Sequence, residues 1–367
     1  SHEPVNGHGI RVLEAISSAH IGGAETFVTS LCATLPDLGA QVHVFCPQGR
    51  AFVDYALERN VPCTSWRTRG KLDPITVVRL ARLIRVTHAD VVHTHLSTAS
   101  LLGALAARLA RRPSVAHVHG LNTATCFRCS NAIIAVSDAV KAHLCAQGIP
   151  SHKVRVIHNG VDLARFQPAP IREAKRAAGL SESAPVVGIF GRLSPEKGQR
   201  LGIEAMFLVL KDCPNAQLLI VGGGPDRDEL ALCAQALRIE SSVRLTGFVE
   251  DVRPLMSACD VVAVPSLKEG FGLAAVEAMA LERPVVAAAV GGLTEIVAPD
   301  TGALVKPGDP QALAEAVSAL LSDPALAQSM GQAGRATVEE RFDLAKQVRA
   351  TYSFLCDIAA HRAPVVV

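Results

Sequence analysis

The sequence lacks three features that would assign it to a simple class. No run approaches the ~18 uninterrupted apolar residues of a membrane-spanning helix, and the start shows no charged-then-apolar secretion signal. Neither sign of charge dominates, because 36 Lys and Arg face 34 Asp and Glu. That balance argues against a protein that coats nucleic acid. We therefore expect a cytoplasmic protein without a nucleic-acid partner.

A disulfide framework is also absent. Most of the ten cysteines lie inside apolar runs, as small buried residues do in a reducing compartment. Cys126 and Cys129 are the one close pair, and a zinc site would need a second pair or histidines at ligand spacing. The pattern predicts no metal site at this pair and leaves its role open.

What the chain does contain is enough apolar sequence for two domains. It has 367 residues, 49% of them hydrophobic, and apolar β-rich runs alternate with helical patterns throughout. This alternation is typical of buried parallel strands joined by crossover helices, and it breaks near residues 167–172 before starting again. We predict an α/β fold with Rossmann-like domains over 9–167 and 173–342 and a helix over 343–361. Strands are expected at 11–15, 41–46, 90–93, 114–118, 185–190, 216–221, 243–246, 260–264, 284–288 and 303–305.

Positive charge is concentrated in the first half of the chain. Residues 1–165 carry 17 Lys and Arg against 10 Asp and Glu, whereas the rest carry 19 against 24. Two interpretations stay open: solvated helix faces, or a surface that contacts an anionic membrane or a phosphorylated acceptor. The basic clusters are Arg67, Arg69 and Lys71; Arg79, Arg82 and Arg85; and Arg108, Arg111 and Arg112.

In open parallel sheets, ligands bind beyond the carboxyl ends of the strands, so the loops after strands should carry the chemistry. The first such loop holds Gly22 and Gly23 directly before a helix, where free N–H groups could meet an anion or the chain could simply turn. Later strands end in His93-Thr-His95 and His117-Val-His119, and alternate residues share a strand face. These histidines could be packed, could bind a metal, or, for His119, could face a substrate.

Two loops of the second half combine charge with glycine. Arg192 and Lys197 follow a strand and could grip a diphosphate, or could be solvated. Farther on, Glu269 and Glu277 flank a helix that begins near Leu273. The free N–H groups of that helix would attract an anion, while the carboxylates would prefer hydroxyls, as on a sugar and a ribose. A capped helix with a solvated glutamate is the alternative.

In their order and spacing these segments resemble the retaining glycosyltransferases of family 4, which have the GT-B architecture. The resemblance implies two Rossmann-like domains whose parallel sheets face each other across a cleft, with a C-terminal helix returning to the N-terminal domain. It covers nearly the whole chain, through residues 22–25, 119–120, 133–137, 156–162, 191–198, 246–249, 269–277 and 291–297.

The resemblance also implies roles for single residues. The catalytic group comprises His119 beside the donor sugar, Arg192 and Lys197 on the diphosphate, and Glu269 on the sugar hydroxyls. No divalent metal or other cofactor is implied. The nucleotide-sugar-binding residues are Gly22, Gly23, Val249, Phe271, Gly272, Leu273 and Glu277.

The implied reaction is retaining transfer of a hexose from a nucleotide-sugar to a glycan or lipid-linked acceptor, in cell-envelope polysaccharide or lipopolysaccharide-type biosynthesis. The basic N-terminal half adds a peripheral contact with the anionic inner face of the membrane. A sugar-nucleotide epimerase of the same fold and a non-enzymatic binding scaffold stay open as alternatives. An NAD-dependent oxidoreductase fits less well, because neither half shows a clean G-x-G-x-x-G loop with a following acidic residue.

The chain departs from the family pattern at three places. Glu282 replaces a glycine, which would cost about 1 kcal/mol if the backbone there is left-handed. Thr294 stands where proline is common before Glu295. Only 17 residues separate His119 from Ser137, a stretch that is often longer in relatives, and this leaves the acceptor open.

Overall fold

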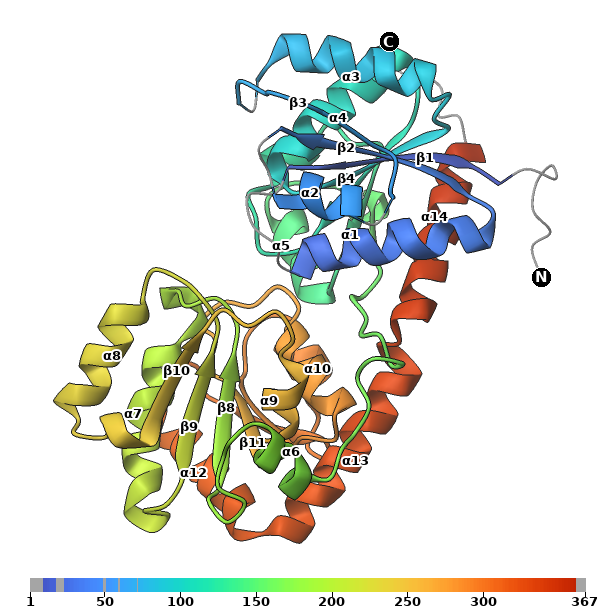
Figure 1. Ribbon diagram of the computed structural model, residues 1–367. Helices are drawn as coiled ribbons and strands as arrows, with labels where there is room; N and C mark the ends of the chain where they lie inside the picture. Colours follow the sequence, from blue (N-terminus) through green and yellow to red (C-terminus); the bar gives the residue numbers. More distant parts are fainter. Residues whose placement is uncertain (1–8, 18–22, 49–50, 59, 71, 361–367) are drawn as a thin grey trace. The chain divides into compact units, whose positions relative to one another are not determined.

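The computed structural model describes residues 9–17, 23–48, 51–58, 60–70 and 72–360 (Figure 1). The chain divides into two units: unit 1 comprises residues up to 159 together with those from 345 onward, and unit 2 comprises 160–344. Each unit is built on a parallel sheet, so the predicted α/β fold of two Rossmann-like parts is confirmed. None of the helices in the described ranges is both long and apolar enough to cross a membrane.

Unit 1 is built on seven parallel strands in the order β3-β2-β1-β4-β5-β6-β7. Four of them lie within two residues of the predicted strands, whereas β3, β6 and β7 are only three or four residues long and were not expected. Parallel neighbours need crossover connections, which the intervening helices supply. The strands are β1 (Arg11–Ile16), β2 (Gln41–Pro47), β3 (Cys63–Trp66), β4 (Val91–His95), β5 (Ser114–Val118), β6 (Ala132–Ala135) and β7 (Val154–Val156).

Helices cover both faces of this sheet. Helices α3 and α4 pack on the face that carries Leu13 and Val92, and α1 and α2 pack on the opposite face beside Ile16 and Val44 (Figure 1). The C-terminal helix returns to unit 1, where its Leu355 is fully buried among strand residues. The helices are α1 (Gly23–Thr34), α2 (Ala51–Glu58), α3 (Pro74–Val86), α4 (Ser97–Ala110), α5 (Asp138–Ala146) and α14 (Leu344–Ala360), with short 3-10 turns at Leu35–Leu38, Ala124–Phe127 and Ser151–Lys153.

Unit 2 is built on six parallel strands in the order β10-β9-β8-β11-β12-β13. Every predicted strand of this half lies within one residue of an observed one. The strands are β8 (Val186–Phe190), β9 (Gln217–Val221), β10 (Val243–Gly247), β11 (Val261–Val264), β12 (Val285–Ala288) and β13 (Gly302–Val305). The helices are α6 (Ile171–Ala177), α7 (Gln199–Asp212), α8 (Arg227–Ala236), α9 (Arg253–Ser257), α10 (Leu273–Ala280), α11 (Leu293–Ile296), α12 (Pro310–Ser322) and α13 (Pro324–Arg341), with 3-10 turns at η4 (Pro195–Lys197) and η5 (Glu240–Ser242).

The turn after α10 is left-handed at Glu282, where φ is 57°. This is the position at which the sequence departs from the family's glycine. Helix α13 packs directly on the turn, because a Cβ at Gly331 would lie 2.2 Å from the carbonyl oxygen of Glu282. The departure therefore places a non-glycine residue in a conformation that L-residues adopt at a cost of about 1 kcal/mol.

Candidate active site

A charged pair joins two loops at the carboxyl edge of the unit 2 sheet. Lys197 ends the η4 turn after β8, and Glu269 lies in the loop between β11 and α10. The Lys197 Nζ donates to both carboxylate oxygens of Glu269, at 3.0 and 2.8 Å, and Ser266 Oγ donates to one of them at 3.0 Å. The side chains of Lys197 and Glu269 are 32% and 12% exposed. The pair is thus held firmly on one side and open to a ligand on the other.

Backbone contacts hold these two loops together. The carbonyl oxygen of Glu196 accepts from the N–H groups of Leu267, at 2.8 Å, and Lys268, at 3.3 Å. Gly198 has a φ of 69°, and a Cβ there would lie 2.1 Å from the carbonyl oxygen of Pro265. Only glycine fits this position. The close approach at Gly198 and the hydrogen bonds of Glu196 therefore pack the loop of Lys197 against the loop of Glu269.

Arg192 lies on the same loop as Lys197, immediately after β8 and Gly191. Its guanidinium Nη2 donates to Glu196 Oε1 at 2.9 Å, and the side chains of Arg192 and Glu196 are 64% and 41% exposed. An exposed pair of this kind contributes little to stability, so an incoming anion can replace Glu196 at small cost. The predicted diphosphate-binding cations therefore share one loop, and both are paired with carboxylates.

The start of α10 presents backbone N–H groups beside this loop. Gly272, with a φ of 110°, precedes the helix, and Leu273 is its first residue. Phe271, which the sequence predicted as a ligand contact, is only 3% exposed and packs edge-on against Phe342. Its ring belongs to the core, so Phe271 can offer a ligand only its main chain.

Gly291 and Gly292 pack closely against the backbone of the loop that carries Glu269. Cβ atoms at Gly291 and Gly292 would lie 1.8 Å from the Glu269 carbonyl oxygen and 2.5 Å from that of Phe271. The N–H of Gly292 donates to the Glu269 carbonyl at 3.3 Å. These glycines belong to the segment 291–297 that resembles the family, and in the structure they support the loop that carries Glu269. The sequence assigned no role to Ser266 and Glu196, because their side-chain contacts, to Glu269 and Arg192, depend on how each loop folds.

Glu277 lies one turn inside α10 and has little access to solvent. Burial raises the pKa of its carboxyl to about 7. A carboxyl held near this value can release its proton when hydroxyl donors reach it. Val249, the remaining predicted contact of unit 2, is partly buried in the loop that follows β10, next to Phe248, which is 72% exposed.

In unit 1 the predicted residue His119 directly follows β5 and belongs to a buried network of imidazoles. Glu14, on the neighbouring part of the sheet, is fully buried and contacts two of them: its carboxylate lies 3.0 Å from His93 Nδ1 and 2.8 Å from His95 Nε2. His95 Nδ1 lies 3.1 Å from His119 Nε2, and His93 Nε2 lies 3.2 Å from His117 Nδ1. The carboxyl-edge histidines that the sequence singled out are therefore one cluster, and sequence reasoning missed its carboxylate.

Burial keeps imidazoles of this cluster neutral. It lowers the pKa of His119 to about 3 and those of His95 and His117 well below their ordinary value, with neighbouring imidazoles adding to the effect. His119 is thus set up for hydrogen bonding and not for carrying charge. Gly23 begins α1, and Gly22 lies outside the described residues.

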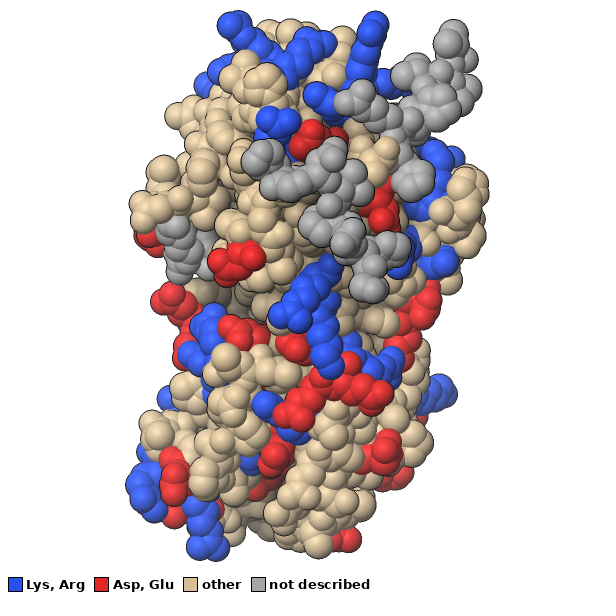
Figure 2. Space-filling model, turned by 90° about the vertical axis from the view of Figure 1, so that its right-hand side faces the viewer, with Lys and Arg blue, Asp and Glu red and all other residues tan. Residues whose placement is uncertain are grey.

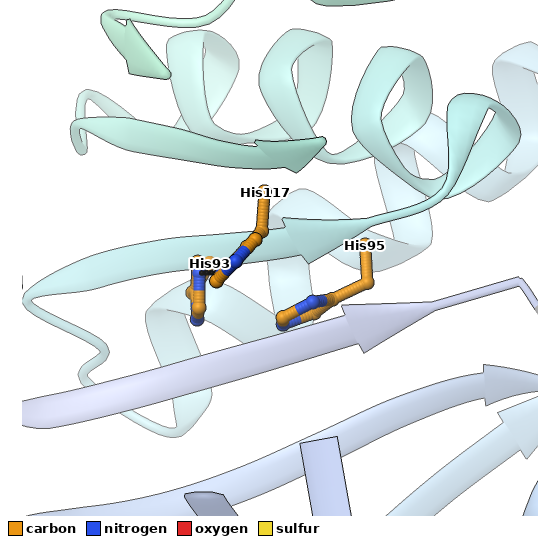
Figure 3. A group of neighbouring side chains, drawn as sticks. All are labelled: His93, His95 and His117. Carbon is orange, nitrogen blue, oxygen red and sulfur yellow. Dashed lines mark hydrogen bonds between the residues drawn. The ribbon is translucent and has the colours of Figure 1, made fainter. Parts of the chain in front are cut away.

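Three of these histidines lie close enough together to be considered as metal ligands. His93, His95 and His117 each offer one nitrogen, and these nitrogens lie within 4.8 Å of one another (Figure 3). A tetrahedral zinc ion, with bonds of about 2.0 Å to imidazole nitrogen, holds its ligand atoms about 3.3 Å apart. Five of their six ring nitrogens already lie at hydrogen-bonding distance from Glu14 or from another imidazole. The sixth, His117 Nε2, is buried without a hydrogen-bond partner among the described residues.

Comparison with known proteins agrees with this geometry. Residues 21–165 match the family described as glycosyltransferase family 4, and residues 170–337 match glycosyl transferases group 1. The chain is 32% identical over 348 residues to D-inositol 3-phosphate glycosyltransferase 1 of Catenulispora acidiphila, covering 83% of each protein. It is 28% identical to the alpha-maltose-1-phosphate synthase of Mycolicibacterium smegmatis, covering 92% of this chain and 96% of the relative.

Solved structures agree as well. HepE of Anabaena, in complex with UDP-glucose, superposes with a TM-score of 0.85 at 28% identity, covering 95% of this chain and all of that one. The resemblance stated from the sequence is confirmed by matches that together span both units. The chain therefore belongs to the GT-B glycosyltransferases of the family 4 type.

Proposed function

We propose that the protein transfers a hexose from a nucleoside-diphosphate sugar to a glycan or lipid-linked acceptor, with retention of anomeric configuration and without a divalent metal. The observation that carries the proposal is the Lys197–Glu269 pair, with Arg192 on the same loop and the N-terminus of α10 alongside. Two cations, a hydroxyl-binding carboxylate and free helix N–H groups are the set that a sugar diphosphate requires.

The chemistry assigns each group a step. As the glycosidic bond to the leaving phosphate breaks, that phosphate gains negative charge, and Arg192 and Lys197 stabilise it, which is the largest available contribution to rate. Glu269 holds hydroxyls of the donor sugar, and Glu277 holds those of the ribose. In the front-face path, the departing phosphate oxygen takes the acceptor's proton, so no carboxylate nucleophile of the double-displacement type is used.

The activities of related proteins support the choice of donor and acceptor. One relative is a D-inositol 3-phosphate glycosyltransferase and another an alpha-maltose-1-phosphate synthase, and HepE was solved with UDP and with UDP-glucose. We propose a uridine nucleotide as the first donor to test and a phosphorylated or lipid-linked glycan as the acceptor, in cell-envelope polysaccharide or lipopolysaccharide-type biosynthesis at the cytoplasmic face of the membrane.

A lipid-linked acceptor would suit one surface of unit 1. The outward face of α3, together with Leu72 two residues before the helix, exposes four aliphatic side chains, with exposed fractions of 55% to 80%, among three arginines. Residues 74–89 contain no acidic side chain. Figure 2 shows Lys and Arg gathered at the end of unit 1 where Figure 1 places α3. This α3 surface consists of Leu72, Ile75, Val78, Arg79, Arg82, Arg85 and Val86.

Mixed aliphatic and arginine side chains on one helix face suit the interface of an anionic bilayer. The C-terminus of α4 extends this surface, because Arg85 Nη2 donates to the carbonyl oxygen of Leu109 at 2.6 Å and Leu109 is itself exposed. Vesicle co-sedimentation should show binding that needs anionic lipid and weakens with salt, and an Arg82→Glu substitution should reduce it. Equal binding to neutral vesicles would contradict the membrane contact and leave the transfer reaction untouched.

The transfer reaction is tested first by ligand-induced stabilisation. UDP, GDP, ADP and their common sugar conjugates are added with and without EDTA, since a ligand at 100 times its Kd adds about 2.7 kcal/mol of stability. We expect stabilisation by one nucleotide class, unchanged by EDTA, and a product whose anomeric configuration matches that of the donor. Stabilisation by NAD alone, or conversion of the donor to its epimer without an acceptor, would overturn the proposal.

A further inference from the structure

In the buried network of Glu14, His95 and His119, the donor and the acceptor of each hydrogen bond can be assigned by counting protons. Glu14 carries a carboxylate, which accepts hydrogen bonds and cannot donate them. His95 Nε2 lies 2.8 Å from Glu14 Oε2, so that nitrogen carries the proton. Because His95 is neutral, its single proton is now assigned and its Nδ1 is a bare lone pair.

The next link repeats the same logic. The bare Nδ1 of His95 lies 3.1 Å from Nε2 of His119, so His119 must donate from Nε2. His119 is also neutral, and its Nδ1 is therefore a bare acceptor. That atom is buried and has no hydrogen-bond partner among the described residues. An unpaired buried acceptor is costly, so a group that donates a hydrogen bond to it would be bound favourably.

Packing holds the His119 ring so that this lone pair keeps one direction. The rings of His117 and His119 are stacked with centroids 4.5 Å apart and an interplanar angle of 5°. Phe27 of α1 meets both rings edge-on, at 4.9 and 6.0 Å between centroids. The strand register places Glu14 beside His93 and Ile16 beside His95, which brings the carboxylate under the histidine face.

We propose that Glu14 is a positioning residue: through His95 it fixes His119 in the Nε2–H tautomer, so that the His119 Nδ1 lone pair accepts a hydrogen bond from a hydroxyl of the donor sugar. This rests on the proposed function for the identity of the hydroxyl. The tautomer itself does not, because it follows from the carboxylate and the two ring contacts. Glu14 touches no substrate, and its influence passes through His95.

The tautomer can be measured without any assay of activity. Two-bond 1H–15N correlation spectra of the full chain distinguish a protonated ring nitrogen from a bare one. We expect His119 to be protonated at Nε2 and bare at Nδ1, with His95 also protonated at Nε2. A proton on His119 Nδ1 would overturn the proposal, and so would one zinc per chain in the purified protein with these nitrogens ligated. Failure of the proposed function, by contrast, would appear as a missing response to every nucleotide-sugar with the tautomer intact.

Substitutions then test the lone pair. Asparagine places its carbonyl oxygen near the position of Nδ1, whereas glutamine places its terminal group near that of Nε2. We expect His119→Asn to keep at least ~10-fold more kcat than His119→Gln. Equal loss in both variants would contradict a contact through Nδ1.

Glu14→Gln tests the upstream step, because an amide offers one acceptor and one donor where the carboxylate offers two acceptors. When its N–H faces His95, the His119 tautomer must reverse, and we expect kcat to fall at least ~10-fold with less change in the donor KM. A reversed His119 with kcat within twofold of the original would overturn the proposal. The matched control is His43→Gln on β2, whose Nε2 contacts Thr64 Oγ1 outside the network and which should leave the tautomer and kcat unchanged.

Discussion

Both units gather polar side chains towards the carboxyl edge of a parallel sheet, on the strands in unit 1 and in the loops that follow them in unit 2, and the two groups differ in their electrostatics. In unit 1, Glu14 and its histidines are buried and joined by hydrogen bonds between neutral rings. In unit 2, Lys197 and Glu269 are full charges that remain partly open to solvent. The same architecture therefore holds a directional hydrogen-bonding group in one unit and exchangeable ions in the other.

The difference follows from the cost of burial. A buried charge without partners is expensive, and the buried carboxylate of Glu14 accordingly contacts ring nitrogens of two histidines. Ions at an accessible edge keep part of their hydration and can exchange one partner for another at modest cost. We infer that the unit 2 site recognises a ligand by its charge, whereas the unit 1 site recognises the position of a hydroxyl group.

The largest expected effect comes from breaking the ion pair of unit 2. Lys197→Ala and Glu269→Ala should each lower turnover by at least ~100-fold, as expected for loss of a principal charge-stabilising group. Because the two side chains contact each other directly, the double variant should cost less than the two single effects combined. Steady-state kinetics with the identified donor gives all three values.

Lys211→Ala serves as the matched control for charge removal, since Lys211 is exposed on α7 and contacts the Phe207 ring. It should change turnover less than twofold. Turnover of Lys197→Ala close to that of this control would show that the unit 2 pair is structural, and the contrast between the two units would then fail.

A smaller effect is expected at Glu277, a half-buried carboxyl of the unit 2 site whose pKa is raised by loss of solvent contact. Its folded pKa of about 7 exceeds the ordinary value of 4.5, so ionisation opposes folding. The contribution of Glu277 to the free energy of unfolding is therefore fully present below about pH 4.5 and is lost as the pH rises through 7. Glu277→Gln should remove this dependence and be about 1 to 2 kcal/mol more stable than the original chain at pH 8.

Urea unfolding at pH 5 and pH 8 measures this difference, and Glu240→Gln, at an exposed glutamate in η5, is the control. The same Glu277→Gln protein should bind the donor about tenfold more weakly at pH 8, because the ribose loses an ionised acceptor. An unchanged pH dependence of stability would show that Glu277 is already ionised in the folded protein.

The sequence predicted the positions of the strands better than it predicted which side chains contact one another. Long apolar runs such as 185–190 and 216–221 were found almost to the residue, since length and flanking polarity mark them clearly. The three-residue strand β7 was missed, because a run that short has no periodicity to detect.

Side-chain pairings depend on information that one sequence does not contain. Glu14 and His95 are 81 positions apart and meet because β1 lies next to β4 with a particular register. The period-two pattern assigns a strand face, but it does not say which strands are neighbours. The burial of Phe271 could not be predicted either, because its position in a glycine-rich motif does not reveal that the ring packs against Phe342 and leaves only the main chain for a ligand. The ligand contact of Phe271 stays a prediction.

The smallest expected effect concerns backbone strain at Glu282, which should change the stability of unit 2 without affecting its charged site. Glu282→Gly should relieve about 1 kcal/mol of left-handed strain and lose roughly half of that to the greater freedom of glycine in the unfolded chain. Since α13 packs on this turn at Gly331, φ stays positive in the variant and the gain is retained. We expect a Tm rise of about 1 to 2 °C with unchanged kinetics, whereas Glu240→Gly, at a residue without positive φ, should lower the Tm. A lower Tm in Glu282→Gly would mean that the Glu282 side chain stabilises the turn by more than its strain, and the departure from glycine would then be a gain for this fold.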